Sequence, residues 1–277
     1  MNKLLTANFF RMFKSKLFWA GILFMAAVGI GFPLVNYNAM IKNDYPLYLD
    51  STFFMGAAFI GVVLSIFCSL FLGTEYSDGT IRNKIIAGQK RTVIYLANLF
   101  TCILAGILMC GVCLVVGLCV GLPLLGSFQN EWNVLLPFIL CIFFLSMAFS
   151  SLFTFIAMTC KSKASSAVIC ILTAFLLIFA ATYIQAQLSE PEIYDSYIYM
   201  DETGNIVTEE AEPNPNYIRG TKREIYKFLN DFLPGGQSFQ IAQMSTKHPY
   251  LLLLYSGILI TATTGTGILI FRQKDLN

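Results

Sequence analysis

Charged residues are scarce in this chain of 277 residues: they make up 12% of it, against about 25% in a typical soluble domain. Hydrophobic residues make up 56%. A water-soluble domain of this length would have too few polar side chains to cover its surface, which excludes a soluble enzyme. The net charge of only +2 gives no strong attraction to nucleic acid, and nucleic acid is not expected as a partner.

Residue patterns for catalysis, metal binding and nucleotide binding are also missing. The chain has a single histidine, His248, and neither a His-Glu-x-x-His nor a Gly-x-x-x-x-Gly-Lys-Ser/Thr motif. Its eight cysteines all lie within apolar stretches or at their ends, so Cys110 and Cys113 are interpreted as small packing residues rather than as a redox or zinc site. We expect no catalytic residue, no metal site and no cofactor bound by this chain, and the chain is not expected to be an enzyme.

Long apolar runs dominate instead. Six of them have about the 20 residues that a helix needs to cross a bilayer: 17–35, 53–73, 93–122, 134–160, 166–186 and 249–271. None contains Asp, Glu, Lys, Arg or His. Because a charge at membrane depth is costly and is retained for function, an ion-coupled transporter or an intramembrane enzyme is not expected. The chain is predicted to be an all-α integral membrane protein, a single domain over residues 1–277 with six transmembrane helices.

Charges outside the six stretches are distributed unevenly. Six spans place both termini on the same side of the membrane. The loops on that side, 1–16, 74–92, 161–165 and 272–277, hold 12 basic and three acidic residues, whereas the loops on the other side, 36–52, 123–133 and 187–248, hold six basic and 13 acidic residues. Because Lys and Arg in short loops mark the cytoplasmic side, both termini are predicted to be cytoplasmic.

The segment 1–16 is predicted to form a helix that lies in the membrane interface. On a helical plot its apolar side chains gather on one face and its cations on the other: Leu5, Phe9, Met12 and Phe13 against Lys3, Arg11 and Lys14. Such a helix directs its cations toward anionic headgroups. The alternative is a disordered basic tail.

The loop 74–92 is predicted to contain a two-turn amphipathic helix on the cytoplasmic side. Asp78 or Thr80 can cap its start, Ile81 and Ile85 share a face, and Gly88 is a natural end. The alternative is a membrane-surface helix that serves only as a turn.

The segment 187–248 is the only long polar stretch and is predicted to be extracellular. A short hairpin is expected around 201–205, because Ile-Tyr-Met before it and Ile-Val-Thr after it are typical of strands. A capping box at 221–224 and apolar residues at 225, 228, 229 and 232 predict an amphipathic helix on the outer leaflet, ended by Pro234. The alternative is a small outer domain that folds independently.

Three local sequences carry a resemblance to a known family. They are Gly-Thr-Glu-Tyr-Ser-Asp-Gly-Thr-Ile-Arg at 73–82 with the basic residues that follow it, Leu-Pro-Gly-Gly at 233–236, and Phe-Arg-Gln-Lys-Asp-Leu at 271–276. With six spans and the helices predicted above, the chain resembles the type-2 ABC exporter permeases, including those that export bacitracin and lantibiotics.

The resemblance implies a mechanism and partners. Two permease halves, identical or different, would pair in the bacterial plasma membrane and would bind two separate ATPase subunits that hold ATP and magnesium. The helix in 74–92 would be the coupling helix that contacts an ATPase. Matching this loop to the family's motif gives six contact residues: Glu75, Tyr76, Gly79, Thr80, Arg82 and Lys84.

The second and fifth spans of this family usually line the dimer interface and the substrate path. The resemblance therefore implies four path residues: Phe59, Phe67, Phe175 and Phe179. A path without charges favours an amphipathic or hydrophobic cargo, such as an antimicrobial peptide, a lantibiotic or a drug. The competing hypothesis is a non-transporting membrane sensor or scaffold that binds an extracellular peptide through 187–248.

Overall fold

Six long helices form the body of the structure. The computed structural model describes residues 2–160, 162–200, 206–209 and 211–274. Within them, the helices long and apolar enough to cross a membrane are α2 (Lys16–Asn43), α4 (Gly56–Ser77) with the short α3 (Asp50–Phe53) before it, α6 (Arg91–Leu125), α7 (Trp132–Thr159), α8 (Lys163–Ser189) and α11 (Pro249–Gln273). Each coincides with one predicted apolar stretch, which confirms a multi-pass, all-α membrane protein.

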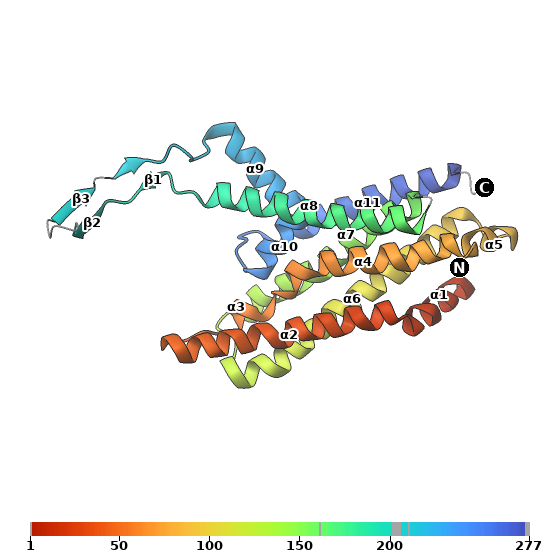
Figure 1. Cartoon of the computed structure of the whole chain (residues 1–277), viewed down its shortest axis with the longest axis horizontal. Coiled ribbons are helices and arrows are strands. Elements are labelled where there is room, and N and C mark those ends of the chain that lie inside the picture. The colour runs from red at the N-terminus through yellow and green to blue at the C-terminus, as the bar shows by residue number, and fades with distance from the viewer. Residues whose placement is uncertain (1, 161, 201–205, 210, 275–277) are drawn as a thin grey trace.

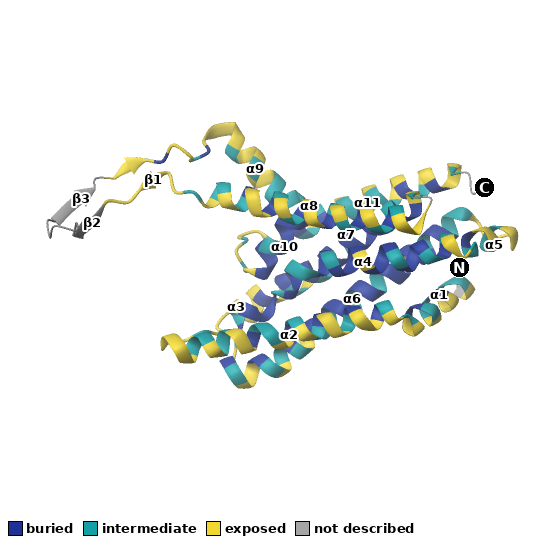
Figure 2. Ribbon diagram, in the orientation of Figure 1, coloured by how far each residue is buried: buried dark blue, intermediate teal, exposed yellow. Residues whose placement is uncertain are grey.

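The spans run along the long axis of the bundle, with α4 at its centre (Figure 1). Helix α4 contacts α2, α6, α7 and α8 and is the most buried span, whereas α11 is the least buried. Figure 2 shows the buried residues concentrated on α4, α6 and α7. The outward faces of α2, α8 and α11 carry exposed Leu, Ile, Phe and Tyr side chains, as expected for helices that face lipid on one side and protein on the other.

The two ends of the bundle differ in what they carry. At one end lie the N-terminal helix α1 (Asn2–Lys14), the short helix α5 (Thr80–Ile86) and the last turn of α11, as Figure 1 shows. From the other end a strand-containing arm projects away from the bundle. Both ends of the described chain thus lie on the same side of the bundle, as an even number of spans requires.

The arm consists of two short antiparallel sheets in sequence. Strands β1 (Ile193–Tyr194) and β4 (Glu212–Pro213) pair at its base, and β2 (Tyr197–Met200) pairs with β3 (Ile206–Glu209) further out. The predicted hairpin is confirmed by the register of Met200 opposite Ile206. Its turn, 201–205, lies outside the described residues.

Two consecutive helices lead from the arm to the last span. Helix α9 (Gly220–Phe232) covers the predicted amphipathic segment, but it starts before Thr221 and has no side-chain cap, so the capping-box prediction is wrong. The prediction that α9 ends before Pro234 is confirmed. The same proline also opens a second, largely buried helix, α10 (Pro234–Ala242), which the sequence pattern did not reveal. Proline is favoured at a first helical position because the missing N–H has no partner there.

Helix α10 can be buried because a glycine lets its backbone approach α8 closely and because its buried polar side chains have hydrogen-bond partners. A Cβ atom on Gly235 would lie 2.2 Å from the carbonyl oxygen of Leu177 in α8, so only glycine allows this approach. Gln237 donates to the carbonyl of Asp231 (2.9 Å) and accepts from the Ser256 hydroxyl of α11 (2.7 Å). The side-chain amide of Gln237 therefore has hydrogen-bond partners inside the bundle.

Gly235→Ala is expected to lower the free energy of unfolding by about 2 kcal/mol, the cost of forcing an extra methyl group against a packed backbone. Thermal unfolding of the purified protein in detergent would measure this as a lower Tm. Gly257→Ala in α11 is the matched control, because nothing lies within 4 Å of the added methyl group there. Equal Tm values for the two variants would contradict the close packing of α10 on α8.

Candidate functional site

A cluster of polar side chains lies where α5 meets the end of α4. The segment 74–92 does contain a two-turn helix, but α4 continues to Ser77, so Glu75 lies in the last turn of a spanning helix rather than in a loop. Gly79 makes the turn between α4 and α5 with a φ of +64°, in the left-handed region that favours glycine. Gly79 is also the residue that precedes α5, and neither Asp78 nor Thr80 caps it, so that prediction is wrong.

Glu75 is fully buried, and both of its oxygens are bonded. Oε1 accepts from Nη1 of Arg11 in α1 (2.6 Å) and from Nζ of Lys84 in α5 (2.5 Å). Oε2 accepts from Nδ2 of Asn98 in α6 (2.7 Å). One carboxylate therefore joins four helices, and the two cations supply the pairing that a buried charge needs.

Two asparagines close these bonds into a ring. Asn8 of α1 donates to Oδ1 of Asn98 (2.7 Å), and Lys84 donates to Oδ1 of Asn8 (3.2 Å). The ring runs from Glu75 to Lys84, Asn8, Asn98 and back to Glu75. We call these four residues and Arg11 the Glu75 cluster. Lys84 belongs to α5, and the other members belong to α1, α4 and α6. The cluster therefore holds α5 against the ends of these three helices.

The charges of the Glu75 cluster do not balance. Arg11 and Lys84 carry two positive charges against the single carboxylate of Glu75. The Arg11 guanidinium also lies over the ring of Phe71, 4.0 Å from its centre, where the ring face attracts a cation. The cluster thus leaves one excess positive charge at this end of the bundle.

Tyr76 fixes the neighbouring helix ends. Its hydroxyl donates to the carbonyl of Met158 near the end of α7 (2.6 Å). Nζ of Lys274 donates to the Tyr76 hydroxyl (3.1 Å) and to the carbonyls of Met158 (3.0 Å) and Cys160 (2.7 Å). The ends of α4, α7 and α11 are therefore tied together beside α5.

The six residues proposed for the loop contact fall into two groups. Glu75, Tyr76 and Lys84 are bonded within the chain, whereas Gly79 and Thr80 are half-buried and Arg82 is exposed. Ile81 packs in the core beneath α5. The opposite face of α5 is open, and its Ile86 side chain is 75% exposed. Helix α5 thus has one face fastened to the spans and one face available to a partner.

Sequence reasoning missed three members of the Glu75 cluster. Asn98 is an amide within an apolar stretch, and this isolated polar residue was a usable signal. Asn8 gave none. The helical plot of 1–16 directed Arg11 toward headgroups and Met12 toward acyl chains. In the structure Arg11 turns inward, because the buried carboxylate of Glu75 attracts it, and Met12 is fully buried in the core.

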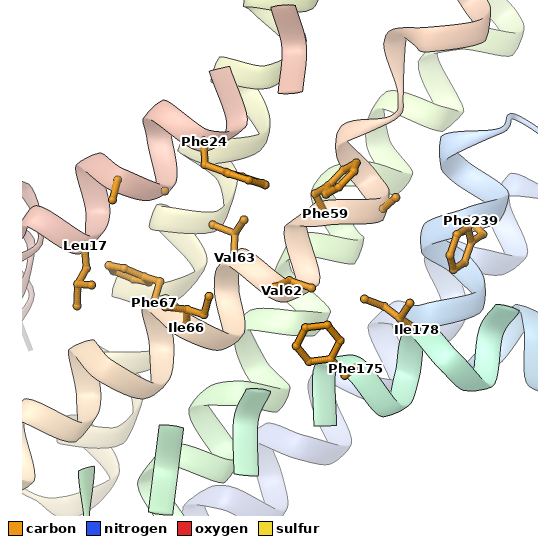
Figure 3. Close-up of a pocket in the computed structure, with 13 residues that line it drawn as sticks. Leu17, Phe24, Phe59, Val62, Val63, Ile66, Phe67, Phe175, Ile178 and Phe239 are labelled. Carbon is orange, nitrogen blue, oxygen red and sulfur yellow. The ribbon is translucent and has the colours of Figure 1, made fainter. Parts of the chain in front are cut away.

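An apolar cavity of about 590 Å³ lies between α2, α4, α8 and α10 (Figure 3). Its lining contains no polar side chain. Phe59, Phe67 and Phe175, three of the four predicted path residues, line this Phe-rich cavity. The fourth, Phe179, is not among the lining residues, and 70% of its side chain is exposed.

The described residues contain no group of His, Cys, Asp and Glu that could hold a metal ion. Comparisons of the chain with protein-family models and with curated proteins find no match. The fold defines the class, a multi-pass membrane protein with six spans, and its two distinctive sites are the Glu75 cluster and the Phe-rich cavity.

Proposed function

We propose that this chain is the membrane-spanning permease subunit of an ATP-binding cassette exporter. The observation that carries the proposal is that one face of α5 is bonded to the spans whereas its opposite face is exposed. Its inner face is bonded through Lys84 to Glu75 of α4 and to Asn8 of α1, and its outer face presents Arg82 and Ile86. A partner that moved α5 would move these helices with it as a rigid unit.

The energy source in this proposal lies outside the chain. Two ATPase subunits would bind at the α5 end and would hold ATP and magnesium, and α5 would act as the coupling helix. A second permease half, identical or different, would complete the transporter. The end of the bundle with α1, α5 and the last turn of α11 would be cytoplasmic, in the plasma membrane of a bacterium, because its loops hold the excess of Lys and Arg.

The accessory helices fit this arrangement. Helix α1 would lie in the inner interface, with Phe10 and Phe13 exposed toward acyl chains. Helix α9 would lie at the outer leaflet, because Ile225 is exposed while Phe228 and Phe232 both pack on Tyr255 of α11. The acidic arm would then be extracellular.

The Phe-rich cavity supports an apolar cargo. Its volume of about 590 Å³ suits a drug-sized group or the apolar part of a larger amphipathic molecule. An antimicrobial peptide, a lantibiotic or a hydrophobic drug has such a part. Phe59, Phe67 and Phe175 would contact it.

The Ile86→Asp variant is expected to lose association with the ATPase without loss of fold, because it places a charge on the exposed apolar side chain at the end of α5. Truncating or charging a central apolar anchor commonly weakens an interface by tenfold or more. The measurement is co-purification of the chain with an ABC ATPase subunit from the same organism, expressed together with it.

Ile193→Asp is the matched control, since Ile193 is 53% exposed at the base of the arm, far from α5. It should co-purify with the ATPase as the unaltered chain does. If Ile86→Asp also co-purified at the normal ratio, α5 would not be the contact and the proposal would lose its main support.

A further inference from the structure

A basic cavity lies where the start of α6 meets the end of α11. Its volume is about 480 Å³, and its lining consists of Lys90, Arg91, Thr92 and Arg272. We call it the basic cavity. Three cations converge on it from two spans that are distant in sequence, so it is a feature of the fold and not of one segment.

The cations of the basic cavity are not neutralised by the described part of the chain. No ion pair between described residues includes Lys90, Arg91 or Arg272. Lys90 and Arg272 are exposed and make no side-chain hydrogen bond within those residues. Their charges are thus available to an anion from outside the chain.

Arg91 is held in place by the other helix. Its Nη1 donates to the carbonyls of Phe271 (3.4 Å), Arg272 (3.1 Å) and Lys274 (2.5 Å) at the end of α11. These bonds occupy one of its nitrogens and fix the orientation of the guanidinium at the edge of the cavity. A guanidinium fixed in this way is preorganised for an oxyanion.

The first turn of α6 adds neutral donors. Lys90 precedes the helix without capping it, and the first turn contains no acidic residue. The first backbone N–H groups of a helix have no acceptor within the helix, so those of Arg91 and Thr92 can serve a ligand, as can the Thr92 hydroxyl. Three cations with hydroxyl and amide donors match the oxygens of a phosphate group.

The surface beside the cavity is apolar. Leu269, one helical turn before Arg272, is 61% exposed, and Ile270 beside it is also exposed. Both belong to a spanning helix, so they lie on the membrane side of the cations. A ligand with a phosphate at the cations and hydrocarbon along α11 is a phospholipid, whereas free phosphate would use only the polar half of this surface.

We propose that the basic cavity binds the phosphodiester headgroup of an anionic phospholipid. The site goes beyond the proposed transport function and does not depend on it, since it requires only that α6 and α11 end at a membrane surface. The bound lipid would tie the ends of these two spans together beside the Glu75 cluster.

The test uses the full chain purified in detergent, with phosphatidylglycerol as the probe. Native mass spectrometry of the Lys90→Gln, Arg272→Gln double variant should show binding about thirtyfold weaker than that of the unaltered chain, from two lost surface cations. Arg91 is left unchanged because it supports the end of α11. Lys42→Gln with Lys247→Gln is the control, since it removes the same charge from exposed positions at the other end of the bundle.

Three outcomes would overturn the proposal. Phosphatidylglycerol could bind the cavity variant as tightly as the unaltered chain, or the control variant could lose as much binding as the cavity variant. Inorganic phosphate alone could also raise the Tm of the unaltered chain as much as phosphatidylglycerol does, which would assign the site to free phosphate. Zwitterionic phosphatidylcholine should bind weakly and equally to all variants.

Discussion

Glu75→Gln is expected to lower the free energy of unfolding by about 3 kcal/mol, because it leaves Lys84 without its buried counter-charge. Removing one partner of a buried ion pair costs more than removing both, since the remaining charge stays desolvated. Arg11 adds to this cost, because its Nε and Nη2 are already buried without a partner and its Nη1 would lose the carboxylate as well. Thermal or denaturant unfolding in detergent would measure the change.

A double-mutant cycle separates the ion pair from other effects of the substitution. Lys84→Met removes the partner charge, and the double variant Glu75→Gln with Lys84→Met should be more stable than Glu75→Gln alone. Asp78→Asn is the matched control, since Asp78 is an exposed carboxylate in the same turn and should change stability by less than about 0.5 kcal/mol. Additive effects of the two single variants would show that Glu75 and Lys84 do not stabilise each other.

Glu75→Gln is also expected to impair transport. If α5 transmits movement through Glu75, the complex with the ATPase should still assemble in Glu75→Gln, because the outer face of α5 is unchanged. Transport should be impaired, because the ion pair between Glu75 of α4 and Lys84 of α5 is lost. Normal cargo-stimulated ATP hydrolysis in this variant would contradict the coupling role.

Local patterns predicted the six spans, the hairpin of β2 and β3, and the helices α5 and α9. The spans follow from apolar runs, the arm from two strand-like triplets around a polar turn, and α5 from two isoleucines one turn apart. These signals need only neighbouring residues, since a helix or hairpin is decided over a few positions. The end of α4 was placed too early, because Thr74 to Ser77 are polar but continue the helix.

The Glu75 cluster could not be predicted in the same way. Asn8 and Asn98 are 90 positions apart, and Lys84 and Asn8 are 76 apart, so only the packing of α1 on α6 brings them together. Helix α10 was missed for a related reason. Its Gln237 and Gln240 are typical of a surface, and they are buried only because α9 and α11 supply partners for them.

Gly79→Pro is expected to abolish the stimulation of ATP hydrolysis by cargo while the chain still inserts and folds. Proline requires a φ near −65°, whereas Gly79 has +64°, and the substitution also removes the N–H that donates to the Tyr76 carbonyl (3.2 Å). The turn that sets α5 against Glu75 would then be lost, but the spans, which do not depend on this turn, would remain. ATP hydrolysis by the reconstituted complex, with and without a cargo that stimulates the unaltered complex, measures the effect.

Gly79→Asn is the control that separates backbone conformation from the loss of glycine itself. Asparagine accepts the left-handed region more readily than other side chains, and a Cβ atom at this position meets nothing within 4 Å. This variant should keep most of the stimulated ATP hydrolysis. Equal loss in the proline and asparagine variants would show that the conformation at Gly79 is not what transmits the signal, and that a partner contacts the glycine surface directly.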